Sequence, residues 1–126
     1  MAKNIEHLGR ISNKPIRELN LVEWKGDGIL VRFDCTEFSS HCPVTGQPDF
    51  AQLEISYVPG QHIVETKSLK LYLWSFRDER KFNELLVDQI ANEFYDQVKP
   101  AWVEVIGSFN PRGGIALTAQ TIRGKR

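Results

Sequence analysis

One segment in the second half of the chain limits the folds that the sequence can adopt. Between residues 81 and 98, apolar side chains recur at helical spacing: Phe82, Leu85, Leu86, Ile90, Phe94 and Val98. Such a stripe occupies one face of a helix, which is stable only when that face packs against other apolar groups. Pro100 ends the segment, because proline cannot continue the hydrogen-bond pattern of a helix. The sequence therefore predicts an amphipathic helix that needs an apolar partner surface.

Four other segments have the composition or the alternation of β-strands. The clearest, residues 50–58, alternates Phe, Gln, Glu and Ser with Ala, Leu, Ile and Tyr, and it ends at Pro59-Gly60. The remaining strand predictions are residues 28–34, 101–109 and 114–122. The five residues 110–114 suit the turn of a hairpin between the last two strands.

The segment from residue 65 to 76 fits two periodicities. Leu69, Tyr72, Leu73 and Phe76 follow helical spacing, whereas Leu69, Leu71 and Leu73 alternate as in a strand. We favour the helix, because the segment is long enough for about three turns. The order β-β-α-α-β-β then predicts an α+β fold, in which both helices pack on one face of a four-stranded antiparallel sheet. Residues 1–27 are expected to be an irregular lead-in, and residues 28–126 a single domain.

Composition narrows the class of partner. The 126 residues include sixteen basic and sixteen acidic side chains, so the formal net charge is zero, and bulk charge supports neither a nucleic-acid nor a membrane partner. The polar N-terminus has no signal-peptide core and no apolar run could span a bilayer, which predicts a cytoplasmic protein. Two open sheet edges in so small a unit predict a homo-oligomer with sites between subunits.

The loop from His41 to Phe50 carries the most distinctive chemistry. It places the Cys42 thiol and the Asp49 carboxylate seven residues apart, among two prolines and a glycine. A nucleophile and a proton donor on stiff, irregular backbone are typical of active sites. Cys35, at the end of a predicted strand, is expected to be structural. No metal-binding spacing is present, so no metal site is predicted.

A second polar cluster runs from Glu65 to Lys70. It can be an ordinary solvated helix start, capped by Thr66 or a neighbour, or an anion site. In the second interpretation Lys67, Ser68 and Lys70 would hold a phosphate near a helix N-terminus. No dinucleotide-binding or P-loop motif is present. A thiol, an acid and a basic cluster fit many reactions, so the residues alone leave the activity open.

Several motifs together resemble one known family. Residues 42–50 (Cys-Pro-Val-Thr-Gly-Gln-Pro-Asp-Phe) resemble the catalytic segment of the NADPH-dependent preQ0 reductases, the QueF family of nitrile reductases. Residues 65–72 resemble that family's Glu-Ser-Lys-Ser-Leu-Lys-Leu-Tyr segment, and residues 75–77 and 111–114 match in kind and order. The similarity covers roughly residues 28–122. It implies the tunnelling fold, whose single-unit subunits form rings with sites at subunit junctions.

The resemblance also implies a reaction and roles for individual residues. The family reduces the nitrile of 7-cyano-7-deazaguanine (preQ0) to an aminomethyl group (preQ1), a step toward queuosine in tRNA, with the free base rather than tRNA as substrate. Cys42 would form a thioimide, Asp49 would donate a proton, and NADPH would be used twice. A nearby lysine, Lys67 or Lys70, would favour the Cys42 thiolate. The substrate residues would be Val64, Glu65, Thr66, Asn83 and Glu84, and the NADPH residues Lys67, Ser68, Lys70 and Arg112.

Two positions depart from the family pattern. Thr66 replaces the usual serine, and Phe82-Asn83-Glu84 replaces Phe-His-Glu. Asparagine forms hydrogen bonds but cannot carry a proton charge as histidine does. Three other functions are weighed: an amidine-forming transferase that uses the same thioimide, a zinc hydrolase of the same fold, and a non-catalytic deazapurine-binding protein. For the hydrolase, the only candidate ligands are Cys35, His41, Cys42 and His62, and their spacing does not support it.

Overall fold

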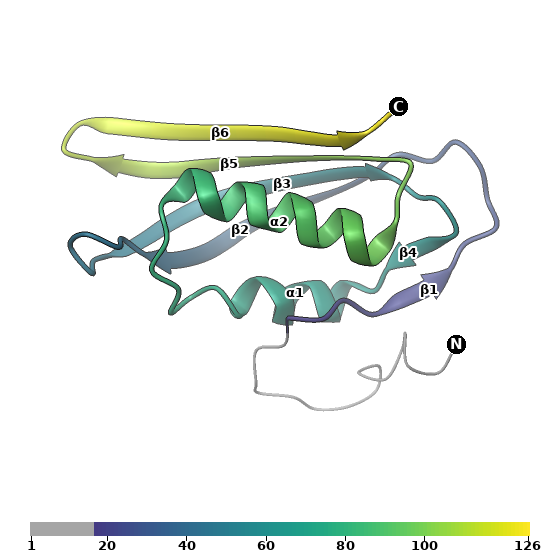
Figure 1. The fold of residues 1–126 in the computed structure, drawn as a ribbon, viewed down its shortest axis with the longest axis horizontal. Coiled ribbons are helices and arrows are strands. Elements are labelled where there is room, and N and C mark those ends of the chain that lie inside the picture. The colour runs from purple at the N-terminus through teal and green to yellow at the C-terminus, as the bar shows by residue number, and fades with distance from the viewer. Residues whose placement is uncertain (1–16) are drawn as a thin grey trace.

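The molecule has two layers, a four-stranded antiparallel sheet and a pair of helices that cover one of its faces (Figure 1). A computed structural model describes residues 17–126. The elements in chain order are β1 (Leu21–Glu23), β2 (Val31–His41), β3 (Pro48–Val58), β4 (His62–Val64), α1 (Thr66–Trp74), α2 (Asn83–Val98), β5 (Trp102–Arg112) and β6 (Ile115–Gly124). The main sheet has the order β2-β3-β5-β6, and β1 pairs with β4 in a separate two-stranded sheet.

The predicted α+β fold with its β-β-α-α-β-β core is confirmed. The ambiguous segment after residue 65 is helical from Thr66 to Trp74, as the helical spacing of its apolar residues indicated. The main difference is β2, which runs to His41 instead of ending at residue 34. Its second half is polar and contains a bulge between Cys35 and Phe38, so neither composition nor strict alternation marks it as a strand. Pairing with the equally long β3 is what keeps it extended.

The N-terminal segment is more ordered than predicted. Leu21–Glu23 forms β1, antiparallel to β4 with Leu21 opposite Val64, so the prediction of irregular structure is wrong for these residues. Leu19 and Asn20 just before it are buried. A strand of three residues has almost no periodicity to detect, and its partner lies some forty positions away. The first sixteen residues of the predicted lead-in lie outside the described part of the chain.

The core lies between β3, β5 and the two helices. On β3 the buried side chains are Ala51, Leu53, Ile55 and Tyr57, in the alternation that the sequence predicts. On α2 the buried side chains are Leu86, Val87, Ile90, Ala91, Phe94 and Val98. Phe82 and Leu85, which the predicted stripe included, are more than half exposed. Since α2 begins only at Asn83, Phe82 lies at the N-cap position without a side-chain capping hydrogen bond, and the buried face is centred on Val87 and Ala91 instead.

Gly107 on β5 lies directly against the side chain of Val87 on α2. A Cβ atom there would lie 2.7 Å from Cγ2 of Val87 and 3.2 Å from Cδ2 of Leu53, both of them buried. We expect Gly107→Ala to lower the free energy of unfolding by about 1–3 kcal/mol, because the packed core must shift to admit the methyl group. Urea unfolding measures this. Ser108→Ala, on the exposed side of the same strand, should change stability little, and equal effects of the two substitutions would contradict the close approach.

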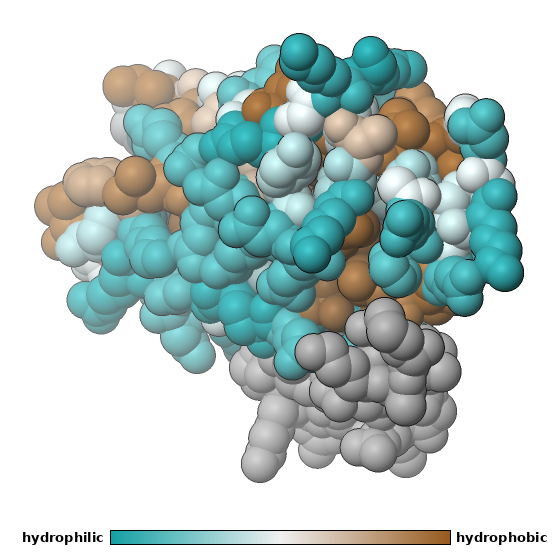
Figure 2. Space-filling model, turned by 45° about the vertical axis from the view of Figure 1, so that its right-hand side comes forward, coloured by the Kyte–Doolittle hydropathy of each residue, from teal (hydrophilic) through white to brown (hydrophobic). Residues whose placement is uncertain are grey.

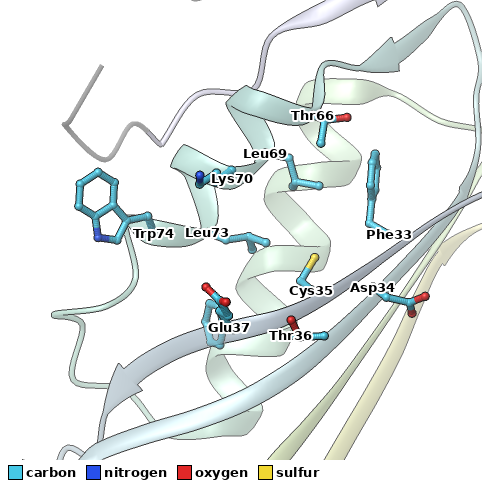
Figure 3. Close-up of a pocket in the computed structure, with 11 residues that line it drawn as sticks. Phe33, Asp34, Cys35, Thr36, Glu37, Thr66, Leu69, Lys70, Leu73 and Trp74 are labelled. Carbon is cyan, nitrogen blue, oxygen red and sulfur yellow. The ribbon is translucent and has the colours of Figure 1, made fainter. Parts of the chain in front are cut away.

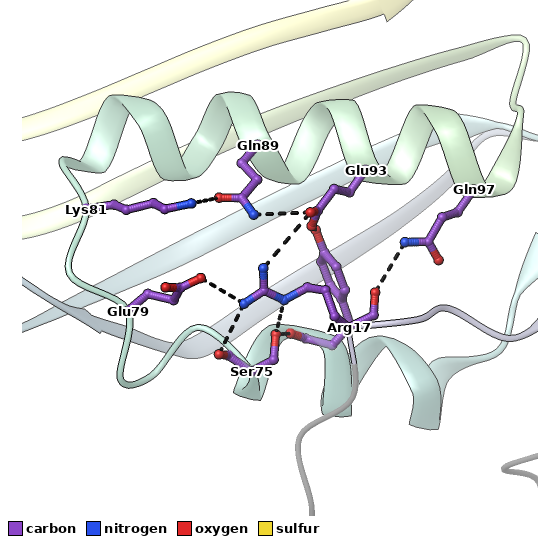
Figure 4. A network of polar contacts seen from close by, with 8 residues as sticks. Arg17, Ser75, Glu79, Lys81, Gln89, Glu93 and Gln97 are labelled. Atoms are coloured by element: carbon purple, nitrogen blue, oxygen red, sulfur yellow. Dashed lines mark hydrogen bonds and ion pairs between the residues drawn. The ribbon is translucent and has the colours of Figure 1, made fainter.

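A polar network ties the N-terminal segment to both helices (Figure 4). The guanidinium of Arg17 lies 3.9 Å from the ring centroid of Phe76 and donates to Ser75 Oγ at 2.6 Å and Glu79 Oε1 at 2.9 Å. The Tyr72 hydroxyl on α1 donates to Glu93 Oε1 on α2 at 2.6 Å. Burial, reinforced by Glu93, raises the pKa of Tyr72 far above its ordinary value, so the hydroxyl remains a donor. The network holds the end of α1, from which the chain continues to the start of α2.

Neither helix within residues 17–126 combines the length and the apolar character needed to cross a bilayer.

Candidate active site

The Cys42 turn, residues 42–47, joins β2 to β3 at one end of the sheet (Figure 1). Two backbone hydrogen bonds close it: the Cys42 N–H donates to the Gln47 carbonyl, and the Gly46 N–H to the Cys42 carbonyl, both at 2.9 Å. Gly46 has a φ of +72°, which favours glycine because it has no Cβ. Local sequence therefore builds a compact turn that presents Cys42.

The turn itself activates the Cys42 thiol. The backbone N–H of Thr45, then the Thr45 hydroxyl and the N–H of Val44, lower the pKa of Cys42, because each hydrogen bond favours the thiolate. Some desolvation and the negative charge of Asp49 act in the opposite direction. The side chain is partly exposed and so is accessible to a ligand. Lys67 and Lys70, the suggested sources of positive charge, are not among the groups that shift this pKa in the single chain.

We expect Thr45→Val to move the alkylation of Cys42 to higher pH, because the thiolate loses the hydroxyl donor while it keeps the backbone donors. At neutral pH, iodoacetamide should therefore modify Cys42 more slowly than in the unmodified protein. Mass spectrometry of the Cys42 peptide across a pH series measures the effect. Thr118→Val, on the exposed side of β6, provides the control, and an unchanged pH midpoint in Thr45→Val would contradict this account of the thiol.

Asp49 is the second residue of β3 and is held by an arginine from the far end of β5. The carboxylate is buried, with 7% of its surface exposed, and its Oδ1 accepts a hydrogen bond from Nε of Arg112. The two terminal nitrogens of Arg112 donate to the Gln47 side chain and to the Pro48 carbonyl. Arg112 thus clamps the Cys42 turn to the β5–β6 turn. It was predicted to bind NADPH, yet in this chain its hydrogen-bonding nitrogens already contact the turn.

The segment that precedes α2 also lies against the Cys42 turn. The His41 N–H donates to the Glu79 carbonyl at 2.8 Å, and the Arg80 guanidinium packs over Gly46, where a Cβ would lie 3.4 Å from Nη2. This contact brings the N-terminus of α2, with Asn83 and Glu84, to the same end of the sheet as Cys42 (Figure 1).

Asn83 and Glu84 are both available for a ligand. Oδ1 of Asn83 is buried and accepts no hydrogen bond from residues 17–126. Leaving such an acceptor unpaired costs about 1–3 kcal/mol, a penalty that a donor on a ligand would remove. Glu84 is exposed in the first turn of α2, where the helix dipole favours a negative charge.

The second predicted cluster surrounds the start of α1. Glu65 caps the helix, with its carboxylate accepting from the N–H of Lys67 at 2.7 Å and of Ser68 at 2.8 Å. The cap is therefore Glu65 and not Thr66. Ser68 is fully buried, and its hydroxyl donates to the Glu65 carbonyl and accepts from the Asn20 N–H. These internal bonds argue against Ser68 as a cofactor ligand. Val64, just before the cap, is 6% exposed.

A cavity of about 380 Å³ lies between β2 and α1 (Figure 3). Phe33, Leu69 and Leu73 supply apolar walls, and the Cys35 sulfur points from β2 toward α1. Thr66 and Lys70, two of the predicted ligand residues, also line it. Burial, assisted by the charge of Asp34, raises the pKa of Cys35 to about 11, so this cysteine remains a thiol near neutral pH. That protonation state agrees with the structural role predicted for Cys35.

The predicted site residues form two groups at opposite ends of the sheet. Cys42, Asp49, Asn83, Glu84 and Arg112 lie at the end that carries the Cys42 turn, while α1 begins at the other end (Figure 1). Strand β3 spans most of this separation, roughly 30 Å at about 3.3 Å per residue. One chain therefore does not bring Glu65, Thr66, Lys67 and Lys70 to Cys42. Within residues 17–126, no three or more His, Cys, Asp or Glu side chains are placed to hold a metal ion.

Fold and site together define a class of protein: an α+β domain with an activated thiol on a hairpin turn and a clamped carboxylate beside it, which suits covalent catalysis. The family model described as "QueF-like protein" matches residues 48–126, more than half of the chain. The chain belongs to this family. Its main sheet and helix pair are the unit of the tunnelling fold.

Two relatives named "NADPH-dependent 7-cyano-7-deazaguanine reductase" illustrate the similarity. The protein of Anaeromyxobacter sp. strain Fw109-5 is 48% identical over 96 residues, which cover 76% of this chain and 79% of that protein. The protein of Staphylococcus haemolyticus strain JCSC1435 is also 48% identical, over 101 residues that cover 80% of this chain and 61% of that protein. The chain therefore spans less than two thirds of the longer relative.

A solved structure shares the fold. The crystal structure of "the archaeosine synthase QueF-Like in the apo form" superposes with a TM-score of 0.74 at 21% identity. The match covers 80% of this chain and 99% of that one.

Proposed function

We propose that this protein reduces the nitrile of 7-cyano-7-deazaguanine to an aminomethyl group with NADPH, through a thioimide on Cys42. The observation that carries the proposal is the Cys42 turn, in which hydrogen bonds lower the pKa of an accessible thiol next to the buried Asp49 carboxylate. Membership of the QueF-like family and 48% identity to proteins named for this reaction support the choice of substrate.

Cys42 and Asp49 share the first chemical step. A nitrile carbon accepts hydride poorly, and addition of the Cys42 thiolate converts it to a more electrophilic thioimide. As the C–S bond forms, the nitrogen must gain a proton. Asp49 takes the proton that Cys42 gives up and passes it to that nitrogen, so charge balances within the pair. Arg112, which holds Oδ1 of Asp49, keeps the carboxylate fixed relative to the turn.

Conversion of a nitrile to an amine needs two hydrides, which NADPH would supply when it is bound. Loss of the thiolate regenerates Cys42, so the net change is the addition of two hydrides and two protons to the nitrile. Lys67 and Lys70 on α1 are the cations best suited to the phosphates, since Ser68 is buried and Arg112 is held by the turn. Their ammonium groups would supply the positive charge for a phosphate, since the Glu65 carboxylate already accepts from the N–H groups of Lys67 and Ser68.

Recognition of the base is assigned to the start of α2. The exposed carboxylate of Glu84 would accept hydrogen bonds from the ring N–H and amino groups of the deazaguanine. The unpaired Oδ1 of Asn83 would accept from a nitrogen of the substrate, although this side chain cannot deliver a proton as histidine could. Val64, Glu65 and Thr66 complete the pocket only if they come from a second chain, given their distance from Cys42 within one chain.

We therefore propose that the active protein is a ring-forming homo-oligomer. Strands β2 and β6 are the two free edges of the main sheet. Exposed apolar side chains lie along them, Ile29 and Leu30 before β2 and Ile115 and Ile122 on β6. Figure 2 shows apolar patches on a largely hydrophilic face of the molecule. Native mass spectrometry should show a closed assembly of several copies, and a monomer at micromolar concentration would contradict the proposal.

A mass measurement without cofactor tests the reaction. Incubation with 7-cyano-7-deazaguanine alone should raise the intact mass by the whole mass of the base, since addition of the thiolate loses no atom. Adding NADPH should then remove the adduct and consume two molecules of NADPH for each amine formed. An adduct that never oxidises NADPH but yields an amidine with ammonia would point to the transferase. Binding without either adduct or turnover would point to a non-catalytic binding protein.

A further inference from the structure

Ser40 is a buried hydroxyl directly opposite the Asp49 carboxylate. It lies on β2, where the antiparallel register pairs it with Asp49 on β3. Its exposed fraction is 0%, and Oγ has no hydrogen-bond partner among residues 17–126. If Ser40 served only to fill space, alanine could replace it without loss of stability, because an unpaired buried hydroxyl costs free energy. The unpaired Oγ therefore calls for a functional reason.

The ladder places Ser40 beside Asp49, although the two side chains form no hydrogen bond in this structure. Residues directly opposite in an antiparallel pair point to the same face, with Cβ atoms about 4.5–5.5 Å apart. Here that face is the one covered by the helices, because Phe38 and Ala51, the next pair along it, are also buried. A serine hydroxyl rotates freely about its C–O bond and can direct its proton toward a neighbouring acceptor.

Asp49 has an oxygen to receive that proton. Arg112 binds Oδ1, and within residues 17–126 no hydrogen bond reaches Oδ2. A carboxylate held through one oxygen can still turn about its Cβ–Cγ bond, whereas a donor at each oxygen defines the plane of the group. Proton transfer between Cys42 and a substrate nitrogen depends on that plane.

We propose that Ser40 is a positioning residue, whose side chain turns about its Cα–Cβ bond to donate from Oγ to Oδ2 of Asp49 and so orients the carboxylate for proton transfer. The inference rests on the proposed function of Asp49, and it adds a residue that the catalytic motif at 42–50 does not contain. Ser40 does not touch the substrate, so its effect should appear in the rate of thioimide formation and not in the affinity for the base.

Ser40→Ala tests the proposal against Ser39→Ala. Ser39 is the adjacent serine on the opposite face of β2, paired with Phe50, so it controls for loss of a hydroxyl from the same strand. Thioimide formation in Ser40→Ala should be roughly 10- to 100-fold slower at saturating base, as expected for a misoriented catalytic group. The dissociation constant of the base should not rise, and the free energy of unfolding should not fall. Ser40→Thr should recover most of the rate.

A double-mutant cycle shows whether Ser40 acts through Asp49. The slowing caused by Ser40→Ala should vanish when Asp49 is already asparagine, because no carboxylate is left to orient. Equal rates in Ser40→Ala and the unmodified protein, an equal loss in Ser39→Ala, or a slowing that persists beside Asp49→Asn would each overturn the proposal.

Infrared spectroscopy separates this inference from the proposed reaction, because it needs no substrate. With ¹³C-labelled aspartate, Ser40→Ala should shift a carboxylate stretching band, and the shift should be absent in the Asp49→Asn background. If Ser40→Ala shifts the band but the unmodified protein forms no adduct, the Ser40–Asp49 hydrogen bond is supported and the proposed nitrile reaction is contradicted. No band shift would overturn the hydrogen bond even if the reductase reaction were established.

Discussion

Cys42→Ser is expected to abolish the thioimide adduct and to slow NADPH oxidation at least about a thousandfold, the scale on which loss of a catalytic nucleophile is felt. The serine hydroxyl is similar in size to the thiol but ionises far less readily, so the hydrogen bonds from Thr45 and Val44 have no thiolate to stabilise. Intact-mass spectrometry with 7-cyano-7-deazaguanine and a nicotinamide absorbance assay measure the two effects.

Cys35→Ser is the matched control for that substitution. Cys35 lies in the cavity beneath α1, and its pKa of about 11 keeps it protonated at neutral pH. Adduct formation should therefore persist in Cys35→Ser, and the Cys42 variant should unfold at the same urea concentration as the unmodified protein because its side chain is partly exposed. An adduct that survives in Cys42→Ser, or moves to Cys35, would contradict the assignment of the nucleophile.

Asp49→Asn is expected to reduce the rate of thioimide formation by about 10²- to 10⁴-fold, the usual contribution of a positioned acid or base. The amide cannot carry the proton from Cys42 to the nitrile nitrogen. Binding of the base should change little, since Asp49 is 7% exposed and its carboxylate is bound to Arg112. Rapid mixing followed by mass analysis gives the rate, and equilibrium titration gives the affinity.

Stability and a second carboxylate provide the controls for Asp49. Asparagine still offers an oxygen to Nε of Arg112, and Arg112 is 38% exposed, so we expect a loss of only about 1 kcal/mol in the free energy of unfolding. Glu54→Gln removes another carboxylate from β3 that pairs with an arginine, Arg32, and should leave the rate unchanged. A comparable slowing in Glu54→Gln would show that general charge, and not the position of Asp49, controls the reaction.

Local patterns explain why much of the fold could be predicted. The alternation on β3 and the stripe on α2 are set by neighbours within a few residues, so they are visible in the sequence. The same patterns failed where pairing overrides local preference. The polar half of β2 is a strand because β3 lies beside it, and β1 forms because β4 offers it an edge.

Only part of the candidate site could likewise be predicted from the sequence. The Cys42 turn could be predicted, since its prolines, glycine and thiol are contiguous and resemble one family's motif. The roles of three residues could not. Thr45 sits inside the motif, but nothing local indicates that it donates to the thiol. Ser68 belongs to the α1 motif yet is fully buried, and Ser40 has no motif at all and is found only through its register with Asp49.

By itself the sequence determined the order of the six main elements, most of the apolar face of α2 and the reactive turn, because each depends on residues close together in the chain. Only the tertiary structure decided what surrounds the thiol. Arg112 reaches Asp49 across 63 positions, and Cys42 and Glu65 lie at opposite ends of the sheet although 23 residues separate them. Such distances depend on strand pairing and packing, so the separation of two residues in the sequence does not predict their separation in space.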